Sequence, residues 1–391
     1  MTRLPQAEWT RRADLAALVA AIDPAGEGVV RWVGGAVRDS LLGLPVKDID
    51  MATRLVPEAV VERLTAAGIR SVPTGLAHGT ITALTEGGPV EITTLRRDVS
   101  TDGRHATVEF SDDWQEDASR RDFTINALYA DPAGGEISDF FGGLDDLAAR
   151  RVRFIGDARA RIAEDYLRIL RYFRFQARYG SEPADAGAES AIADLAAGLR
   201  GLSRERVGWE WLRLLAHPDP AATVQRMGEL GVLTHVLPEA DPAALPALIA
   251  AEHACGIAPD PLRRLAAMLP ADPPLAEAVA ARLRLSTAQK KRLATAAARA
   301  GAPGDPFALA YRLGTVGATD RLLLAGLDAA PIQDWPIPVL PLKGGAIVAR
   351  GLAGPDVARV LRAVENAWIA EGFPDAARVR ALCEAAITSP R

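Results

Sequence analysis

The chain has 391 residues, of which 49% are hydrophobic and 24% charged, a composition typical of soluble globular proteins with several domains. Its formal net charge of −5 excludes binding to nucleic acid through overall positive charge, so an RNA contact must come from a local cluster of Arg and Lys. Cys255 and Cys383 stand alone, which excludes a cysteine zinc site and a disulfide framework. No apolar stretch is long enough to cross a bilayer, so we expect a cytoplasmic protein without a signal peptide.

The first predicted elements are an amphipathic helix over residues 1–22 and a strand that leads into a glycine turn. The apolar run 29–33 predicts a buried strand, and Gly34 and Gly35 allow a sharp turn into a short helix over 36–42. Backbone N–H groups at such a turn can approach an anion closely because glycine has no side chain. We therefore expect this turn to bind phosphate.

Two carboxylates follow the glycine turn. Residues 46–52 alternate between apolar and polar, which predicts a second strand with Asp48 and Asp50 on one face. Two neighbouring carboxylates repel each other unless a cation lies between them, and oxygen ligands beside a phosphate favour Mg²⁺. The combination predicts a metal-dependent phosphoryl or nucleotidyl transfer site, although an ordinary turn beside a solvated strand face is the alternative.

The next segments complete a predicted α/β head with a small mixed sheet. A helix is expected over 57–67 and strands over 69–72, 79–84 and 90–95. Glu91 lies on the last of these strands and is a candidate third carboxylate beside Asp48 and Asp50, although a solvent-facing position explains it equally well. The polar stretch 96–113 is expected to be a mobile loop.

A helix over 114–130 would carry Arg120 and Arg121 on its polar side, and a short strand is expected over 136–139. The stretch 150–178 then contains nine arginines and three acidic residues, which is the local basic cluster that the net charge conceals. Its apolar spacing predicts a single helix over about 157–179.

Asp165 and Arg168 would share one face of that helix, followed at the same interval by Arg171 and Arg174. An i,i+3 salt bridge on a solvated helix is the simplest interpretation. A carboxylate accepts hydrogen bonds, however, and a guanidinium only donates them. Cytosine and adenine present an amino donor beside a ring-nitrogen acceptor, whereas uracil and guanine present a carbonyl beside an N–H. One Asp–Arg pair can therefore select C and A and reject U and G.

The sequence resembles the class II tRNA nucleotidyltransferase and bacterial poly(A) polymerase family, within the polymerase-β-like nucleotidyltransferase superfamily. The resemblance is strong over the first half of the chain and weak over the rest. It is carried by GGAVRDSLLGLPVKDID, TGLAHGTITA at 74–83, VEITTLR at 90–96, RRDFTINAL at 120–128, EDYLRILRYFRF at 164–175 and SRER at 203–206.

The resemblance implies an α+β fold with a nucleotidyltransferase head over 1–145, followed by an all-α neck over 146–215, body over 216–310 and tail over 311–391. Asp48, Asp50 and Glu91 would be catalytic, with Mg²⁺ held by Asp48 and Asp50. One of Arg120 and Arg121 would lie over the triphosphate, and the sequence does not distinguish them. The implied nucleotide-binding residues are Gly34, Gly35, Arg38, Arg120, Arg121, Asp165, Arg168, Arg171 and Arg174.

Helices are predicted throughout the C-terminal half, where a resemblance at 342–361 has Gly-Ala in place of the usual Arg-Asp pair. Their predicted ranges are 221–231, 242–256, 260–269, 274–284, 287–300, 306–325, 354–371 and 374–387. We expect the tail over 311–391 to bind tRNA, with a purely structural helical scaffold as the alternative for this half. No obligate protein partner and no membrane is expected.

The activity implied is template-independent addition or repair of the 3′-terminal CCA of tRNA from CTP and ATP, with release of pyrophosphate. In the family, a loop at 96–113 accompanies the change from adding C to adding A, so its presence here, with DGR at 102–104, disfavours addition of CC alone. A poly(A) polymerase is a second possibility, although TGLAHGTITA lacks the arginine-rich extension usual in those enzymes. A catalytically silent RNA-binding protein would have lost Asp48 and Asp50, which are both present.

Overall fold

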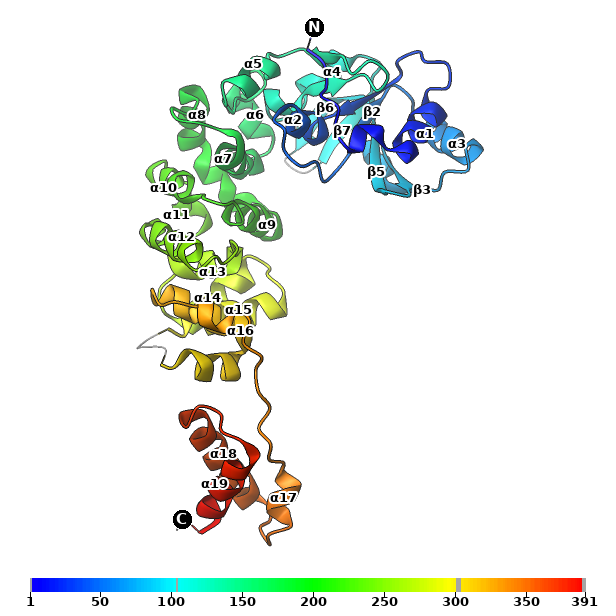
Figure 1. Cartoon of the computed structure of the whole chain (residues 1–391). Helices are drawn as coiled ribbons and strands as arrows, with labels where there is room; N and C mark the ends of the chain where they lie inside the picture. The colour runs from blue at the N-terminus through cyan, green and yellow to red at the C-terminus, as the bar shows by residue number, and fades with distance from the viewer. Residues whose placement is uncertain (1, 103–104, 300–303, 389–391) are drawn as a thin grey trace. The chain divides into compact units, whose positions relative to one another are not determined.

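All the strands in the described part of the chain lie in its first 139 residues, and helices dominate the remainder (Figure 1). The computed structural model describes residues 2–102, 105–299 and 304–388. The chain forms two units, one made of Met1–Leu214 with Ala222–Pro238 and the other of Leu215–Ala221 with Glu239–Arg391. Among the described residues, no helix is both long and apolar enough to cross a membrane.

The main sheet has seven strands in the order β3-β4-β5-β2-β1-β8-β9. The pair β2 and β5 is parallel, and the other neighbouring pairs are antiparallel. The mixed sheet and the α+β class expected from the sequence are thereby confirmed. The strands are β1 (Val30–Val33), β2 (Asp50–Thr53), β3 (Ser71–Gly75), β4 (Thr80–Thr85), β5 (Gly88–Thr94), β8 (Leu128–Ala130) and β9 (Ile137–Asp139).

The two faces of this sheet are covered by different helices. On one face the ring of Trp32 meets that of Trp9 edge-on at 5.3 Å, next to helices α1 (Ala13–Ile22) and α3 (Pro57–Ala66), which contact β4. On the other face the side chains of Val33 and Ala52 pack against α4 (Trp114–Ser119) through Trp114. Because successive side chains of a strand alternate between faces, Asp50 lies on this second face with Val33 and Ala52.

The strand that carries the paired carboxylates is shorter than predicted, because β2 begins at Asp50 and Asp48 precedes it. Strand β1 ends at Val33, which is the partner of Asp50, and the chain then turns at Gly34, so residues before Asp50 have no strand of β1 beside them. The leading helix is also shorter than predicted and begins at Ala13. Residues before it bond instead to the turn before β9, with the N–H of Leu4 donating to the carbonyl of Gly135.

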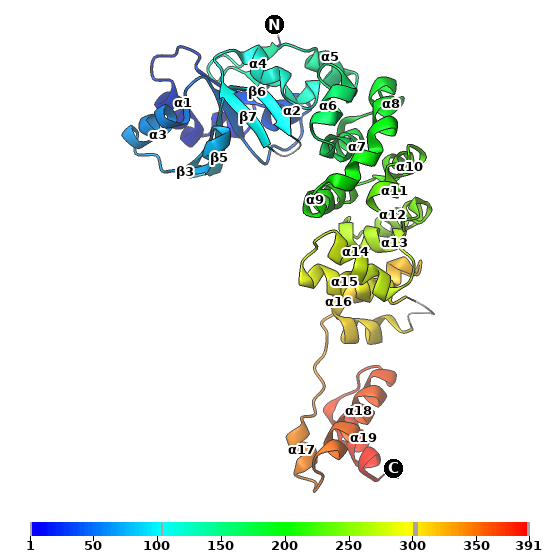
Figure 2. The same cartoon turned by 180° about the vertical axis from the view of Figure 1, so that it is seen from behind.

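The segment 96–113, expected to be a mobile loop, contains a two-stranded antiparallel hairpin of β6 (Arg96–Asp102) and β7 (His105–Phe110). Figure 2 shows this hairpin with α4 above it. The charges that suggested a loop pair across the strands, since the Arg97 guanidinium lies 2.8 Å from the Glu109 carboxylate. Residues 103–104 of the DGR motif lie outside the described residues.

The prediction of a helix over 114–130 was wrong beyond residue 119. Helix α4 ends at Ser119, Phe123 is extended, and a 3₁₀ turn over Thr124–Asn126 leads into β8. The side chain of Asp122 accepts hydrogen bonds from the N–H of Phe123 and from the amide of Asn126, both at 2.9 Å. Such local bonds compete with helix formation, so Asp122 ends the helical pattern.

The single helix predicted over 157–179 is two helices, α6 (Ala158–Glu164) and α7 (Leu167–Tyr179), with a break at Asp165. Asp165 has extended backbone angles, with φ −153° and ψ 105°. Its carboxylate accepts a 3.0 Å hydrogen bond from the N–H of Leu167, and its carbonyl accepts one from the N–H of Arg168. A side-chain acceptor for the first free N–H groups is a common reason for a helix to begin.

Most of the other helices agree closely with the predicted ranges, but α5, α8, α11 and α17 were not predicted. The helices not yet named in the first 238 residues are α2 (Gly35–Leu41), α5 (Gly143–Ala148), α8 (Ala186–Leu195), α9 (Arg204–Leu215), α10 (Ala221–Glu229) and α11 (Leu233–Val236). The C-terminal set is α12 (Leu245–Ala254), α13 (Pro261–Met268), α14 (Pro273–Arg282), α15 (Thr287–Ala297), α16 (Pro306–Leu324), α17 (Gly344–Val348), α18 (Pro355–Ala370) and α19 (Ala376–Thr388).

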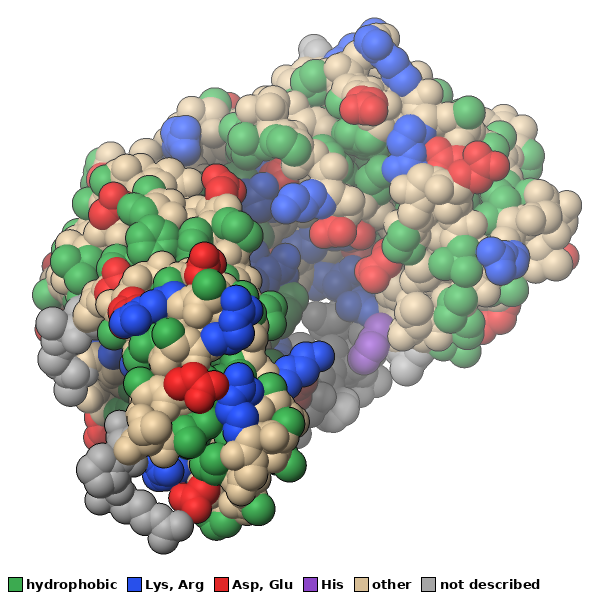
Figure 3. All heavy atoms as spheres, turned by 60° about the horizontal axis from the view of Figure 1, so that its bottom comes forward, with side chains coloured by type: hydrophobic (Ala, Val, Ile, Leu, Met, Phe, Trp, Pro, Cys, Tyr) green, Lys and Arg blue, Asp and Glu red, His purple; other side chains and the backbone are tan. Residues whose placement is uncertain are grey.

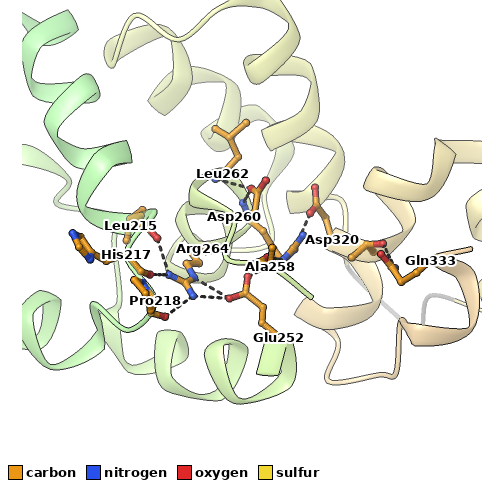
Figure 4. Close-up of polar contacts among 12 residues, drawn as sticks. Leu215, His217, Pro218, Glu252, Ala258, Asp260, Leu262, Arg264, Asp320 and Gln333 are labelled. Atoms are coloured by element: carbon orange, nitrogen blue, oxygen red, sulfur yellow. Dashed lines mark hydrogen bonds and ion pairs between the residues drawn. The ribbon is translucent and has the colours of Figure 1, made fainter. Parts of the chain in front are cut away.

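A buried network of charges lies at the start of the second unit (Figure 4). Arg264 is fully buried, and its guanidinium bonds the Glu252 carboxylate at 2.8 Å and the carbonyls of Leu215 and Pro218 at 2.8 and 2.9 Å. It also donates to the carbonyl of His217. One cation thus holds the segment that follows α9 to the helices α12 and α13.

We expect Arg264→Met to destabilise the second unit by about 3–5 kcal/mol, because the substitution removes the donor to three buried carbonyls and leaves the buried Glu252 carboxylate paired with Arg263 in place of two cations. The measurement is urea denaturation followed by circular dichroism. Arg378→Met is the matched control, since Arg378 pairs with Glu371 at the surface, and it should leave the midpoint unchanged. Equal midpoints for the two variants would contradict the role of Arg264.

Candidate active site

A cavity of about 760 Å³ opens within the first unit, between the second face of the sheet and helices α7 and α9. Figure 3 shows a hollow in the surface where blue Lys and Arg side chains gather beside red carboxylates. The cavity brings together motifs that lie far apart in the sequence, because the glycine turn, the start of α7 and the SRER motif all contribute residues to its walls. Its walls are formed by Gly34, Gly35, Arg38, Asp50, Arg121, Asp122, Asn126, Asp165, Leu167, Arg168, Arg171, Phe175, Ser203, Glu205, Arg206, Trp209 and Glu210.

The glycine turn lies directly beneath an arginine. Gly34 has φ +68°, a conformation that favours glycine, and a Cβ built there would lie 3.6 Å from a terminal nitrogen of Arg121. The chain then enters α2 at Gly35, so that helix begins directly after the turn beside Arg121. The turn and Arg121 together form a wall of donors suited to a phosphate group.

Asp117 holds Arg120 and Arg121 in fixed positions. Its carboxylate bonds Arg120 at 2.6 Å and Arg121 at 3.1 Å, and it accepts a 2.6 Å hydrogen bond from the hydroxyl of Tyr129. Burial alone would raise the pKa of Asp117, but the two guanidiniums and the Tyr129 hydroxyl lower it to about 2. Of the two arginines, Arg121 lines the cavity and Arg120 does not.

The three carboxylates of the predicted catalytic set lie beside one another at the edge of the cavity. Asp50 and Glu91 are register partners on the parallel strands β2 and β5, and Asp50 faces the cavity. Asp48 and Glu91 are exposed and do not line it. Burial and the charge of Glu91, with a smaller contribution from Asp48, raise the pKa of Asp50 to about 6 against the opposing effect of Arg121. The ionised form of Asp50 is therefore destabilised, first by burial and then by the neighbouring negative charge of Glu91.

Arg38, predicted to contact phosphate, is tied to other side chains of the first unit. Its guanidinium donates to the hydroxyl of Tyr179 at 2.5 Å and to the side-chain oxygen of Asn126, and it stacks 4.1 Å from the Tyr179 ring centre. It also pairs with Asp39 at 2.8 Å. Arg38 lines the cavity, but its main contacts join α2 to α7.

The predicted base-selecting residues both reach the cavity, but they are not partners of each other. The carboxylate of Asp165 accepts a 2.6 Å bond from Arg206 on α9, and Arg168 pairs with Glu164 and donates to the carbonyl of Arg161 at 2.6 Å. The break before α7 places Asp165 at the first turn of that helix, next to Arg168. Both side chains are held by bonds that leave them at the cavity wall.

The remaining predicted arginines bind carboxylates that were not among the predicted site residues. Arg171 donates to the Asp122 carboxylate at 2.8 and 2.5 Å, and Arg174 donates to Glu210 at 2.6 Å. Burial would raise the pKa of Asp122, yet Arg171 and the hydrogen bond from Asn126 hold it well below its usual range. Asp122 and Asn126 fall within RRDFTINAL, so that motif could have identified them as site residues. No sequence pattern identifies Glu210 before its partners in the structure are known.

The chain is similar in sequence to known protein families and proteins. Residues 30–153 match the family model described as the poly A polymerase head domain, and residues 185–244 match the one described as the probable RNA and SrmB-binding site of polymerase A. The mitochondrial CCA tRNA nucleotidyltransferase 1 of Mus musculus is 35% identical over 364 residues, which cover 88% of this chain and 83% of the relative. The chain belongs to the CCA tRNA nucleotidyltransferase family.

Other members of the CCA tRNA nucleotidyltransferase family agree in sequence and in fold. The CCA-adding enzyme of Leuconostoc citreum is 42% identical over 186 residues, or 47% of this chain and 45% of the relative. The Bacillus stearothermophilus CCA-adding enzyme, solved in complex with CTP, superimposes with a TM-score of 0.71 at 25% identity and covers 92% of this chain and 94% of that chain. The family likeness therefore extends into the helical half, where the sequence motifs alone were weak.

Asp50→Asn should stabilise the metal-free protein at about pH 8 by about 1–3 kcal/mol. The pKa of Asp50 is raised in the folded state, so the folded protein binds this proton more tightly than the unfolded chain. Its stability must then fall as the pH rises from about 4 to about 6. Asparagine does not ionise and escapes this loss. Chemical denaturation across this pH range in the presence of a chelator measures the effect.

The matched control is Glu62→Gln, since Glu62 is an exposed acid on α3 that does not line the cavity. Its stability difference from the parent should not change with pH. A gain for Asp50→Asn that persists unchanged below about pH 4 would contradict the proposed titration of Asp50.

Proposed function

We infer that the chain adds or repairs the 3′-terminal CCA of tRNA, with CTP and ATP as substrates and pyrophosphate as the product. The observation that carries this conclusion is a single cavity bounded by Asp50 and the glycine turn on one side and by Asp165 and Arg168 on the other. A nucleoside triphosphate has its phosphates at one end and its base at the other. The two sides of the cavity offer donors and carboxylates suited to each end.

The family transfers nucleotides with a divalent metal, and we propose that the metal here is Mg²⁺ held by Asp48 and Asp50. The carboxylates suit such an ion, because Asp50 and Glu91 are register partners on neighbouring strands and their like charges, after burial, help to raise the pKa of Asp50. Among the described residues, no group of three or more His, Cys, Asp or Glu could hold a metal alone, and Mg²⁺ is commonly bound by one or two carboxylates together with substrate phosphates. Bound there, the ion would lower the pKa of the RNA 3′ hydroxyl and neutralise charge on the triphosphate.

The phosphates are assigned to the glycine turn and Arg121. The N–H of Gly34 donates to the carbonyl of Leu128, so the backbone donors offered to phosphate begin at Gly35, the first residue of α2. Asp117 fixes the nearby Arg121 guanidinium in advance. Donors that are positioned before the reaction stabilise charge on the transferring phosphoryl group without reorganisation. Arg120 serves by holding Asp117 on its other side.

The base is assigned to Asp165 and Arg168. A carboxylate oxygen of Asp165 would accept from the amino group of cytosine or adenine, and Arg168 would donate to the adjacent ring nitrogen. Uracil and guanine would place a carbonyl against the carboxylate and an N–H against the guanidinium. Because C and A satisfy the pair equally, the order of addition must come from the RNA end and other parts of the site.

Poly(A) polymerase is the second candidate, and the name of the matched head model is the observation that favours it. That model covers only the first part of the chain, whereas the likeness to a CCA tRNA nucleotidyltransferase extends over 88% of it. The cytoplasmic location expected from the sequence stays a prediction, since some relatives are mitochondrial forms.

Purified protein with Mg²⁺ should extend tRNAs that lack CCA, CA or A by the missing nucleotides and then stop. Asp48→Asn and Asp50→Asn should each lower the rate by at least about 1,000-fold, because the charge that binds the metal is lost. Labelled CTP and ATP, supplied singly and together, measure the products on gels. Glu62→Gln is the control acid and should retain the full rate.

Binding of the same tRNAs, measured by filter retention, should survive both Asp substitutions. Continued addition of A to arbitrary RNA would favour the polymerase. RNA binding without any incorporation would favour a silent RNA-binding protein. Undiminished turnover in Asp50→Asn would remove Asp50 from the catalytic set.

Asp165→Ala should relax the choice of nucleotide, so that the preference for CTP over UTP falls by about 10- to 100-fold. The substituted site no longer opposes a carboxylate to the uracil carbonyl. The ratio of kcat/KM for the two nucleotides on a tRNA that lacks CCA measures this preference.

Arg159→Ala is the control for general loss of charge in the same basic stretch. Arg159 is exposed, pairs with Asp194 and lies outside the cavity. It should leave the CTP to UTP ratio unchanged. A ratio in Asp165→Ala equal to that of the parent would show that selection lies elsewhere.

A further inference from the structure

Helix α9 carries a row of three exposed residues at intervals of four, Glu205, Trp209 and Arg213. Residues four apart on a helix are neighbours on its surface. The first two of these residues line the cavity, and Arg213 continues the row away from it. The row is therefore a surface that leads out of the proposed active site.

Trp209 is unusual in this row because its side chain is large and apolar, yet 54% exposed. The core side of α9 is supplied by other residues, since Val207, Trp211 and Leu214 are each at most 1% exposed. Trp209 consequently contributes little to the core and presents much of its ring to solvent. An exposed aromatic ring at the edge of a cavity offers a stacking surface.

Arg213 lies over this ring, with the centre of its guanidinium 4.2 Å from the ring centre. The Arg213 guanidinium makes no hydrogen bond and no ion pair with another residue in the described part of the chain. Arg168, Arg171 and Arg174, by contrast, each pair with a carboxylate. Its positive charge remains available on the exposed row. An aromatic ring beside an arginine without an acidic partner is the combination that binds single-stranded nucleic acid, where bases stack and phosphates need cations.

The position of this pair relates it to the base-selecting residues. Arg206 precedes Trp209 by three residues and bonds the carboxylate of Asp165 at 2.6 Å. A base whose edge contacts Asp165 and Arg168 leaves its faces free to stack. The base next to it in an extending strand is the last base of the RNA, and Trp209 is one helical turn from Arg206 on the way out of the cavity.

We propose that Trp209, backed by Arg213, is the stacking platform for the 3′-terminal base of the RNA acceptor. This inference rests on the proposed function and assigns a positioning residue for the RNA strand. The ring fixes the base, and through it the 3′ hydroxyl that attacks the nucleotide. Arg213 contributes attraction for the phosphate that precedes this base.

The test uses a tRNA that ends in CC, with the fluorescent base pyrrolocytosine as its last nucleotide, and no CTP or ATP. Trp209→Ala should weaken binding about 10- to 100-fold and restore fluorescence that stacking quenches. Trp209→Phe keeps an aromatic face and should recover most of the affinity and quenching. Under turnover, Trp209→Ala should raise the KM for the RNA and leave the KM for ATP within about twofold of the parent.

Arg213→Gln should weaken binding and reduce its dependence on salt, because one cation near the RNA is removed. Arg204→Gln is the matched control on the same helix, since Arg204 donates to the carbonyl of Arg200 and does not line the cavity. Its affinity for the RNA should equal that of the parent. Circular dichroism melting of all four variants establishes that each is folded.

Unchanged quenching and affinity in Trp209→Ala would overturn the platform. A raised KM for ATP with unchanged RNA binding would overturn it too, because the ring would then stack on the incoming nucleotide. If Trp209→Ala fails to fold, Trp209→Phe and Trp209→Leu are compared in its place. Stronger quenching of the terminal base in Trp209→Phe than in Trp209→Leu supports the platform, and equal quenching in the two variants contradicts it. Failure of the parent to incorporate C or A would refute the proposed function separately, since the binding measurement needs no turnover.

Discussion

The buried ion pair between Asp122 and Arg171 is the contact on which the geometry of the site depends. Asp122 follows directly after the arginines that adjoin the glycine turn, and Arg171 lies one turn along α7 from Arg168. The pair therefore sets the separation between the wall assigned to phosphate and the wall assigned to the base. The Arg38 contacts to Asn126 and Tyr179 reinforce the same connection. A carboxylate at this position is costly to bury alone, so its loss would disturb both walls together.

The same principle accounts for a basic cavity in an acidic chain. The arginines of the cavity are held by carboxylates from different elements: Asp117 for Arg121, Asp122 for Arg171 and Glu164 for Arg168. Paired guanidiniums keep fixed directions and still have N–H donors to spare, because each carries five. The net charge of the chain thus says little about this site, where local pairing decides which donors face the substrate.

Local sequence patterns predicted much of the fold. The glycine turn followed by a short helix, the mixed sheet with Glu91 next to Asp50, and most C-terminal helices were all predictable, because each rests on nearby residues or on simple periodicity. The failures have a common cause. Asp122 and Asp165 lie within stretches of helical spacing, but their side chains bond nearby backbone N–H groups and end the helix. Periodicity counts apolar positions and does not register such caps.

Eight of the twelve predicted site residues line the cavity, and Asp48, Glu91, Arg120 and Arg174 do not, while the partners of the eight were not predictable. Asp165 and Arg168 were expected to share one helix face, with a salt bridge between them as the simplest interpretation, whereas Arg206 and Glu164 are their partners. Glu210 and Trp209 reach the cavity only because α9 packs beside α7, a contact between segments about forty residues apart that no local pattern encodes.

The division of the chain between its two units has a mechanical consequence. The chain passes from one unit to the other after Leu214, after Ala221 and after Pro238. A single cut between residues 221 and 222 would leave an N-terminal fragment that ends at residue 221. Its last residues would still be hydrogen-bonded to the Arg264 guanidinium through the carbonyls of Leu215 and Pro218. The nicked protein would then run as two pieces under denaturing conditions and as one particle under native ones. Connectivity of this kind makes the units hard to separate as independent modules.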